Sequence, residues 1–200
     1  MIDRIYTEKS FSIMISFLLI GTMLTAFVSN DVLLTDVSAS GGDFAGGDGT
    51  EGNPYIIEDV WDLQNMSADL GANYTLGNNI DASETRSWNA GKGFMPIGNI
   101  SSRFTGSLDG HGYNINDLFI ERPSMTSVGL FGISESPGIC NVSIIDCNIT
   151  GDFRVGGLIG QNMLDVDNCS ITGRVIGSDD VGGMVGYNFG TINNCSFTGT

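Results

Sequence analysis

Histidine and cysteine are the residues most able to do chemistry at neutral pH, and this chain holds one histidine and four cysteines. The histidine, His111, lies between Gly110 and Gly112, a setting typical of a turn, with no strained nucleophile turn nearby. A Ser-His-Asp or Cys-His relay would need this residue, so we predict no catalytic residue of that kind. The cysteines lack Cys-x-x-Cys spacing, which argues against zinc. They are Cys140, Cys147, Cys169 and Cys195.

Carboxylates are the other candidates for catalysis. Glycoside hydrolysis needs two carboxyl groups about 5–10 Å apart, and lyases of acidic polysaccharides need a base beside cations. Four aspartates cluster in turn-rich segments: Asp165, Asp167, Asp179 and Asp180. The six basic residues that follow Ala39 are scattered and form no basic groove: Arg86, Lys92, Arg103, Arg122, Arg154 and Arg174. An enzyme acting on an acidic sugar is therefore the weaker alternative.

The acidic turns could instead bind calcium, a hard cation that takes roughly six to eight oxygen ligands. The segment Gly-Gly-Asp-Gly at 46–49 resembles calcium-binding Gly/Asp repeats, but it occurs once and does not iterate. We therefore predict solvated turn carboxylates and no cofactor, with calcium as the weaker alternative.

The net charge of −15 excludes whole classes of partner. A phosphate backbone needs a basic surface, so we predict no nucleic acid, and an anionic membrane face would be repelled as well. Such acidity favours solubility through self-repulsion. Binding of divalent cations and adaptation to a salty medium are the alternatives.

The N-terminus indicates export. Arg4 and Lys9 precede an apolar stretch at 11–28, and Val37-Ser38-Ala39 offers small residues at the positions a signal peptidase reads. We favour a signal peptide over residues 1–39, cleaved after Ala39. The alternative is an uncleaved anchor, in which case residues 11–28 are the one segment in contact with membrane. Either way, residues 40–200 are expected outside the cytoplasm, secreted or at the cell surface.

Many of these residues lie within a sequence repeat, and the fold of that repeat must position them. Val155-Gly156-Gly157-Leu158-Ile159-Gly160 recurs 26 residues later as Val181-Gly182-Gly183-Met184-Val185-Gly186, and Asn168-Cys169-Ser170 recurs as Asn194-Cys195-Ser196. An earlier copy, Val128-Gly129-Leu130, lacks one glycine. A period of this length means that each unit buries its apolar face against its neighbours.

The fold class follows from the units themselves. The apolar runs are short and rich in Val and Ile, turns separate them, and no helical period appears after residue 72. We predict an all-β fold, a right-handed parallel β-helix. The paired glycines fit sharp corners, where either a positive φ or a close approach between coils is required.

These repeats resemble the GLUG motif, which is named for a small Gly-Leu-apolar-Gly core. VGGLIG…DNCSITG and VGGMVG…NNCSFTG carry the resemblance, and the stretches at 94–98, 104–110 and 49–57 resemble the segments that lead into such repeats. The resemblance covers roughly residues 46–200 and implies an exported prokaryotic surface protein with an adhesive or envelope role. It implies no enzymatic activity.

A short helix is expected ahead of the repeats. Apolar residues at 60, 63, 66 and 70 form one helical face, with Asp59 as the N-cap and Gly71 as the stop. We predict that this helix caps the first coil and that Tyr74 to Asp81 form the first strand after it. The expected divisions are the opening segment and helix at 40–72, irregular coils at 73–127, and GLUG-type repeats at 128–200 that are truncated at Thr200.

Two columns should form where repeats stack. Cys169 and Cys195 would lie one coil apart, at about 4.8 Å, as a ladder of free thiols or as a disulfide, and we favour the thiols. Asparagines at 141, 168 and 194 precede this column and also begin Asn-x-Ser/Thr sequons. We prefer a hydrogen-bonded amide ladder to glycosylation there. Candidate glycosylation sites elsewhere are Asn73, Asn99 and Asn148.

The combined reading is a non-catalytic extracellular or cell-envelope module for adhesion or surface structure, bound to an unidentified surface ligand such as a glycan or envelope component. The alternative is the N-terminal part of a carbohydrate-active β-helix enzyme, a polysaccharide lyase or glycosidase. Ten residues form the predicted repeat core: Val155, Gly156, Gly157, Leu158, Gly160, Val181, Gly182, Gly183, Met184 and Gly186.

Overall fold

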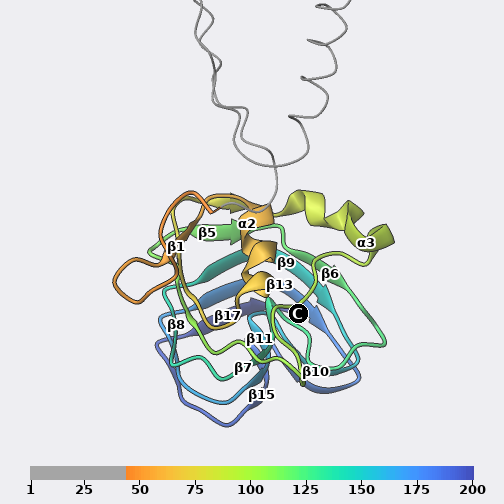
Figure 1. Ribbon diagram of the computed structural model, residues 1–200. Coiled ribbons are helices and arrows are strands. Elements are labelled where there is room, and N and C mark those ends of the chain that lie inside the picture. The colour runs from red at the N-terminus through yellow and green to blue at the C-terminus, as the bar shows by residue number, and fades with distance from the viewer. Residues whose placement is uncertain (1–43) are drawn as a thin grey trace, which may run out of the picture. The chain divides into compact units, whose positions relative to one another are not determined.

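The computed structural model describes residues 44–200, in which strands stack as parallel coils (Figure 1). One coil runs through four strands, each on a different sheet: β8 (Gly138–Cys140), β9 (Ser143–Thr150), β10 (Phe153–Gly156) and β11 (Ile159–Asn162). Strand pairing between coils is parallel, so the predicted parallel β-helix is confirmed. The predicted signal peptide or anchor falls outside the described residues. Within 44–200, no helix has the length and apolar character needed to cross a bilayer.

The first long sheet follows the order β1-β2-β4-β8-β12-β16. Its remaining strands are β1 (Tyr55–Ile57), β2 (Asn73–Leu76), β4 (Ser107–Asp109), β12 (Val166–Asp167) and β16 (Ile192–Asn193). The strand predicted at 74–81, the first after the helix, is wrong in its extent, because it is divided into β2 and a separate strand at Ile80–Asp81.

The second long sheet follows the order β17-β13-β9-β5-β3, and β6 also pairs with β9. Its strands besides β9 are β3 (Ile80–Asp81), β5 (Asn114–Asn116), β6 (Phe119–Glu121), β13 (Ser170–Ile176) and β17 (Ser196–Gly199). Inward side chains of successive coils lie in register. Ile115, Ile144 and Ile171 form one such column, buried at 0–1% exposure, and Phe197 follows them.

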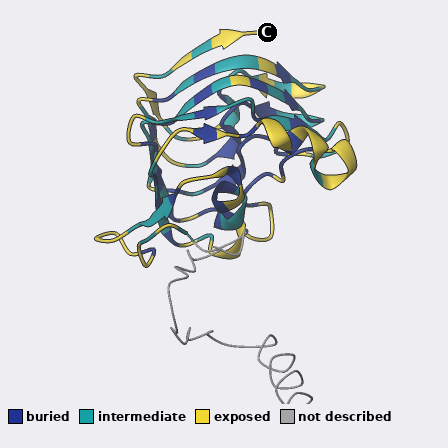
Figure 2. Cartoon of the chain, turned by 90° about the horizontal axis from the view of Figure 1, so that it is seen from above, coloured by how far each residue is buried: buried dark blue, intermediate teal, exposed yellow. Residues whose placement is uncertain are grey.

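Two smaller sheets complete the coils: β10 pairs with β14 (Asp179–Gly182), and β11 lies between β7 (Phe131–Ser134) and β15 (Val185–Asn188). The register joins Val155 to Val181 and Ile159 to Val185, which is the 26-residue period of the sequence. Figure 2 shows buried positions repeating from coil to coil, while the last strand, β17, is largely exposed. Burial of these aliphatic columns is the main stabilising contribution, at about 1.5–3 kcal/mol per fully buried side chain.

The repeat glycines serve close approach. None of the six in the two VGG motifs has a positive φ. A Cβ on Gly156 would lie 2.3 Å from the carbonyl oxygen of Ile159, and one on Gly160 would lie 2.5 Å from the backbone of Ser127 and Val128. Of the two roles the sequence allowed, the structure therefore selects contact between backbones, which lets the two smaller sheets lie against each other.

The N-terminal helix exists but is shorter than predicted. Helix α2 spans Val60–Asn65, and Oδ1 of the N-cap Asp59 accepts hydrogen bonds from the N–H groups of Trp61 and Asp62 at 2.8 and 2.9 Å. A 3-10 turn, η1 (Met66–Ala68), follows, so Gly71 does not end the helix. The physical reason lies at Asp69, whose extended backbone, with φ of −136° and ψ of 91°, leaves the helical path, so that the Leu70 carbonyl accepts hydrogen bonds from Thr105 and Gly106 of the next coil.

The predicted capping position is consistent with the contacts of this helix. Val60, Leu63 and Met66 are buried at 0–2% exposure, and α2 packs against β1, the outermost strand of the first sheet. The opening segment covers the edge of β1 in turn, because Ala45 and Gly46 exchange backbone hydrogen bonds with Ile56. An edge covered in this way cannot pair with another chain.

A second helical segment lies after residue 72, where the sequence shows no helical period. It comprises the 3-10 turn η2 (Ser83–Ser87) and α3 (Trp88–Gly91), in which Asn89 and Ala90 have φ of 52° and 58°. Trp88 contacts Trp61 of α2, with ring centroids 4.3 Å apart. These turns have no amphipathic repeat, so periodicity could not reveal them.

Candidate functional site

The residues most able to do chemistry do not converge. His111 is an exposed turn residue with φ of 51°, and its Nδ1 lies 3.9 Å from Asp109 Oδ2, beyond hydrogen-bond distance. Cys140 pairs in register with Asp109, but burial, reinforced by Asp109 and Asp167, raises the pKa of its thiol. A cysteine nucleophile needs the opposite shift. Among residues 44–200 no hydrogen bond joins Cys140 to His111.

The four clustered aspartates serve turns and coil contacts. Asp165 accepts a hydrogen bond from the Thr191 N–H at 3.0 Å, one coil away, and Asp179 accepts one from the Asp180 N–H at 2.9 Å. Asp167 lies in the first sheet and pairs with Cys140. No group of three potential metal-ligating side chains occurs within the described part of the chain, so the calcium alternative has no cluster there to rest on.

Cys169 and Cys195 stack as the repeat requires, with Val142 in the preceding coil. Both are free thiols in the structure, and the Cys169 N–H donates to Cys195 Sγ at 3.3 Å. Burial raises the pKa of Cys169 to about 12, and that of the core residue Cys147 to about 11.

The four thiols should therefore react in two classes. At pH 8 a thiol of pKa 12 is a thiolate in only about one molecule in ten thousand, and the thiolate is the reactive form. We expect an aromatic disulfide reagent to modify the half-buried Cys140 and Cys195 quickly in the native chain and to modify Cys147 and Cys169 only as it unfolds. Reagent titration with and without urea measures this. A disulfide would be established instead if the mass of the native chain is two hydrogens below that of the fully reduced chain and if Cys169 and Cys195 both stay unreactive after unfolding.

The asparagine column forms a corner of each coil. Asn141, Asn168 and Asn194 all adopt left-handed backbone conformations, with φ of 49–56°. Asn168 Nδ2 donates to Asn141 Oδ1 at 3.4 Å, and Asn141 Nδ2 donates to Asp109 Oδ1 at 2.9 Å. This geometry favours the amide ladder. The left-handed corner is an additional reason for asparagine, which tolerates that region better than most residues.

The three candidate glycosylation sites differ in accessibility. Asn73 is engaged at both amide atoms, donating to the Gly49 carbonyl at 3.1 Å and accepting from Ser107 Oγ at 2.7 Å. The Oδ1 atom of Asn148 is buried. Asn99 lies exposed in a turn, where its Oδ1 accepts from the N–H groups of Ser101 and Ser102. Asn99 is thus the most accessible predicted acceptor.

An internal amide column was not predicted. Asn162, only 1% exposed, donates through Nδ2 to Asn188 Oδ1 of the next coil at 2.8 Å, and Ser134 holds the same place one coil earlier. The same amide group also donates to the Leu164 carbonyl. The signal was available, because Gln161-Asn162 and Tyr187-Asn188 are 26 residues apart.

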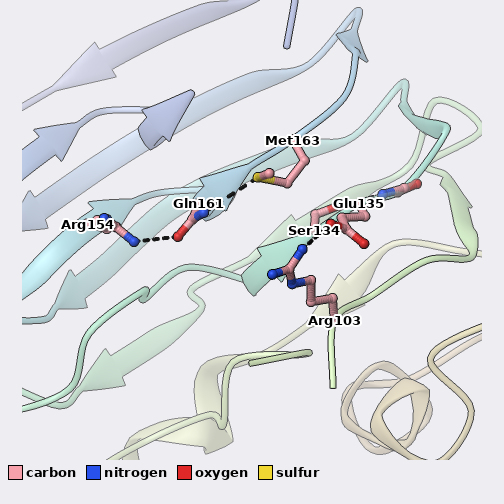
Figure 3. Close-up of polar contacts among 7 residues, drawn as sticks. Arg103, Ser134, Glu135, Arg154, Gln161 and Met163 are labelled. Carbon is pink, nitrogen blue, oxygen red and sulfur yellow. Dashed lines mark hydrogen bonds and ion pairs between the residues drawn. The ribbon is translucent and has the colours of Figure 1, made fainter. Parts of the chain in front are cut away.

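Arg154 is the most unusual polar residue of the fold and was also missed. Its φ is 59°, and its Nη1 donates to Gln161 Oε1 at 2.6 Å (Figure 3). Its Cζ lies 5.0 and 4.7 Å from the ring centroids of Phe153 and Tyr187. Asp180 is equivalent to Arg154 in the next coil, and its Oδ2 lies 3.9 Å from Arg154 Nε. Opposite charges one period apart were the sequence signal, since residues stacked in register interact directly.

Arg103 and Glu135 form a second ion pair in the same region (Figure 3). Arg103 precedes β4 and Glu135 follows β7, and the side chains are each about one-third exposed. A pair this accessible contributes little to stability, about 0–1 kcal/mol.

Comparison with known proteins places these coils in context. Residues 151–176 match the family model of the GLUG motif. Halomucin of Haloquadratum walsbyi is 42% identical over 147 residues, which is 68% of this chain and 2% of that protein. A Gly-rich membrane protein of Evansella cellulosilytica is 36% identical over 138 residues, or 64% of this chain and 15% of that protein. The chain thus spans a small part of these relatives.

Among solved structures, an immunoglobulin A1 protease from Bacteroides ovatus superposes with a TM-score of 0.52 over 80% of this chain and 51% of that one. The sequence identity is 19%, so the similarity shows a shared fold and carries no activity with it.

Proposed function

We propose that this chain, which carries the GLUG motif on a parallel β-helix, is a non-catalytic module of a secreted or cell-surface protein and serves adhesion or surface structure. The observation that carries the proposal is the in-register stack itself. Its interior is filled by aliphatic columns, and the residues that could do chemistry are distributed over several strands and turns. Such a stack is a rigid rod whose outer faces are free to bind.

The relatives support a surface role. One is named as a mucin and the other as a membrane protein, and both are far longer than the matched segment. A repeat module inside a very long chain increases the distance to which that chain extends from the cell surface. The net charge of −15 suits this setting, because self-repulsion keeps a long surface chain solvated.

The non-catalytic part of the proposal rests on the electrostatics of the candidates. An acid–base or nucleophilic site needs partners within hydrogen-bond distance and pKa values moved toward neutrality. Here the Cys140 and Cys169 thiols have raised pKa values, and the solvent-exposed His111 ring lies 3.9 Å from Asp109 Oδ2, beyond hydrogen-bond distance.

Two measurements on the producing cells and the purified chain test this function. Antibodies raised against residues 44–200 should label intact cells, and the soluble chain, added in excess, should reduce attachment of those cells to their native surface. Labelling that requires permeabilised cells would contradict the surface location. Turnover of any uronic-acid polymer by the purified chain would contradict the non-catalytic assignment.

A further inference from the structure

A surface pocket of about 460 Å³ opens beside Arg154, on the side of the coil stack. One wall is apolar and consists of Ile100, Met125, Ile133 and Phe153. Ile100 is 70% exposed, which is high for an aliphatic residue of this size. The volume falls in the range of sites that hold small ligands, and such sites typically combine an apolar wall with a few polar groups.

The polar groups of this pocket are Asn99, Thr126, Ser127 and Arg154. None of the residues lining it is acidic, although the chain has a net charge of −15. Arg154 is the one charged residue of the lining, and its partner Asp180, whose Oδ2 lies 3.9 Å from Arg154 Nε, does not line the pocket. Charge complementarity points to a ligand with a carboxylate.

Arg154 is built into this position. Its guanidinium is held against the rings of Phe153 and Tyr187 and donates one hydrogen bond to Gln161. The side chain is 31% exposed, and its Nη2 group has no partner among residues 44–200. The guanidinium thus retains donors in a fixed plane, and such a plane matches the two oxygens of a carboxylate.

The backbone at Arg154 adds a second observation. A non-glycine residue with φ of 59° is uncommon, and the left-handed region is unfavourable for residues other than Gly, Asn or Asp. Ser127 and Asp180 hold the equivalent place in adjacent coils and share this conformation, so the fold imposes it. The corner turns each of these side chains to the same side, and in the coil beside the pocket that side chain is an arginine.

We propose that this pocket binds a carboxylated sugar unit, a hexuronic acid within a surface or envelope glycan, with the carboxylate on Arg154 and the ring over the apolar wall. The proposal rests on the adhesive function proposed above and specifies its ligand. Hydroxyl and amide groups of Thr126, Ser127 and Asn99 supply the neutral hydrogen bonds that sugar hydroxyls require. A chain of net charge −15 repels dense polyanions at long range, so the preferred glycan carries isolated uronic acids among neutral sugars.

The first arm of the test compares matched sugars. The chain is produced in a host without N-glycosylation, because Asn99 lines the pocket and also begins a sequon. Methyl glucuronide and methyl galacturonide are titrated against methyl glucoside and methyl galactoside, followed by protein NMR shifts. We expect saturable shifts at residues 99–101, 125–127 and 153–154 with the acids only. Equal binding of acid and neutral sugars, or no binding of either acid at its solubility limit, overturns the proposal.

The second arm uses variants. Arg154→Gln should weaken binding of the acids by about tenfold or more, since a charged hydrogen-bond pair is worth about 1.5–3 kcal/mol. Arg174→Gln removes the same charge from the exposed face of β13 and should leave affinity unchanged. Equal losses in both variants would show that net charge, and not this pocket, governs binding.

A third pair of variants keeps the proposal testable if Arg154→Gln does not fold. Ile100 is exposed, so Ile100→Asn and Ile100→Asp should both fold, and only the aspartate should repel the acidic ligand. Similar binding by both overturns the assignment, as does equal affinity for a short acetylated peptide through its terminal carboxylate. Surface labelling of cells is independent of every arm, so failure here leaves the surface location standing.

Discussion

Replacing Gly160 by alanine is expected to lower the free energy of unfolding by at least about 3 kcal/mol. The added Cβ would lie 2.5 Å from Ser127 C and Val128 N, and real Cβ atoms essentially never approach backbone atoms this closely. The obstructing atoms belong to the segment that precedes β10 by one coil, and they pair with Arg154 and Val155. They cannot move without breaking that pairing, so the cost exceeds the about 1–3 kcal/mol of ordinary overpacking. A loss of this size is a large fraction of the stability of a typical domain.

Gly52→Ala provides the matched control. No atom lies within 4 Å of the position its Cβ would take, and its φ is not positive. Alanine there should leave stability unchanged or raise it by about 0.4–1 kcal/mol, because it restricts the unfolded chain. Urea unfolding followed by circular dichroism measures both variants. Equal midpoints for Gly160→Ala and Gly52→Ala would show that the repeat glycines are not required for close approach.

The repeat that contains these glycines made the register of the strands predictable from the sequence. The 26-residue period predicted the register, and the register is observed between Val155 and Val181 and between Ser170 and Ser196. Period and register are set by local spacing, which a single sequence displays directly. The role of each glycine needed coordinates, because the sequence permits either a positive φ or a close contact.

Features that depend on contacts between coils were harder to predict from the sequence. The helical path that begins with α2 ends at the extended Asp69, beside which the Leu70 carbonyl pairs with Thr105 and Gly106, 35 and 36 positions later in sequence. The surroundings of Arg154 combine three strands, with Tyr187 and Gln161 brought beside it by stacking. The opposite charges of Arg154 and Asp180 were visible in the repeat, but the pocket was not.

The second large effect on stability is expected at helix α2, which caps the first coil. Leu63→Ala should lower the free energy of unfolding by about 2–5 kcal/mol, because the Leu63 side chain of α2 is fully buried and its truncation leaves a cavity. Ser67→Ala, at an exposed position of the following turn, should change stability by no more than about 0.5 kcal/mol. Urea unfolding again supplies the comparison.

The part of the chain in which Leu63→Ala lowers stability distinguishes a capping role of α2 from the general effect of removing a buried leucine. In a stack where each coil contacts only its neighbours, weakening one end lets that end open first. Amide hydrogen exchange in Leu63→Ala should therefore accelerate most in β1 and β2, the first strands of their sheet, and least in β9 and β13, which belong to later coils. Acceleration spread evenly over all coils would mean that the described residues unfold as one cooperative unit and that α2 contributes only its buried area. If amide protection in Leu63→Ala is lost most in the N-terminal coil and less in each following coil, α2 is the element that caps the N-terminal end of the β-helix.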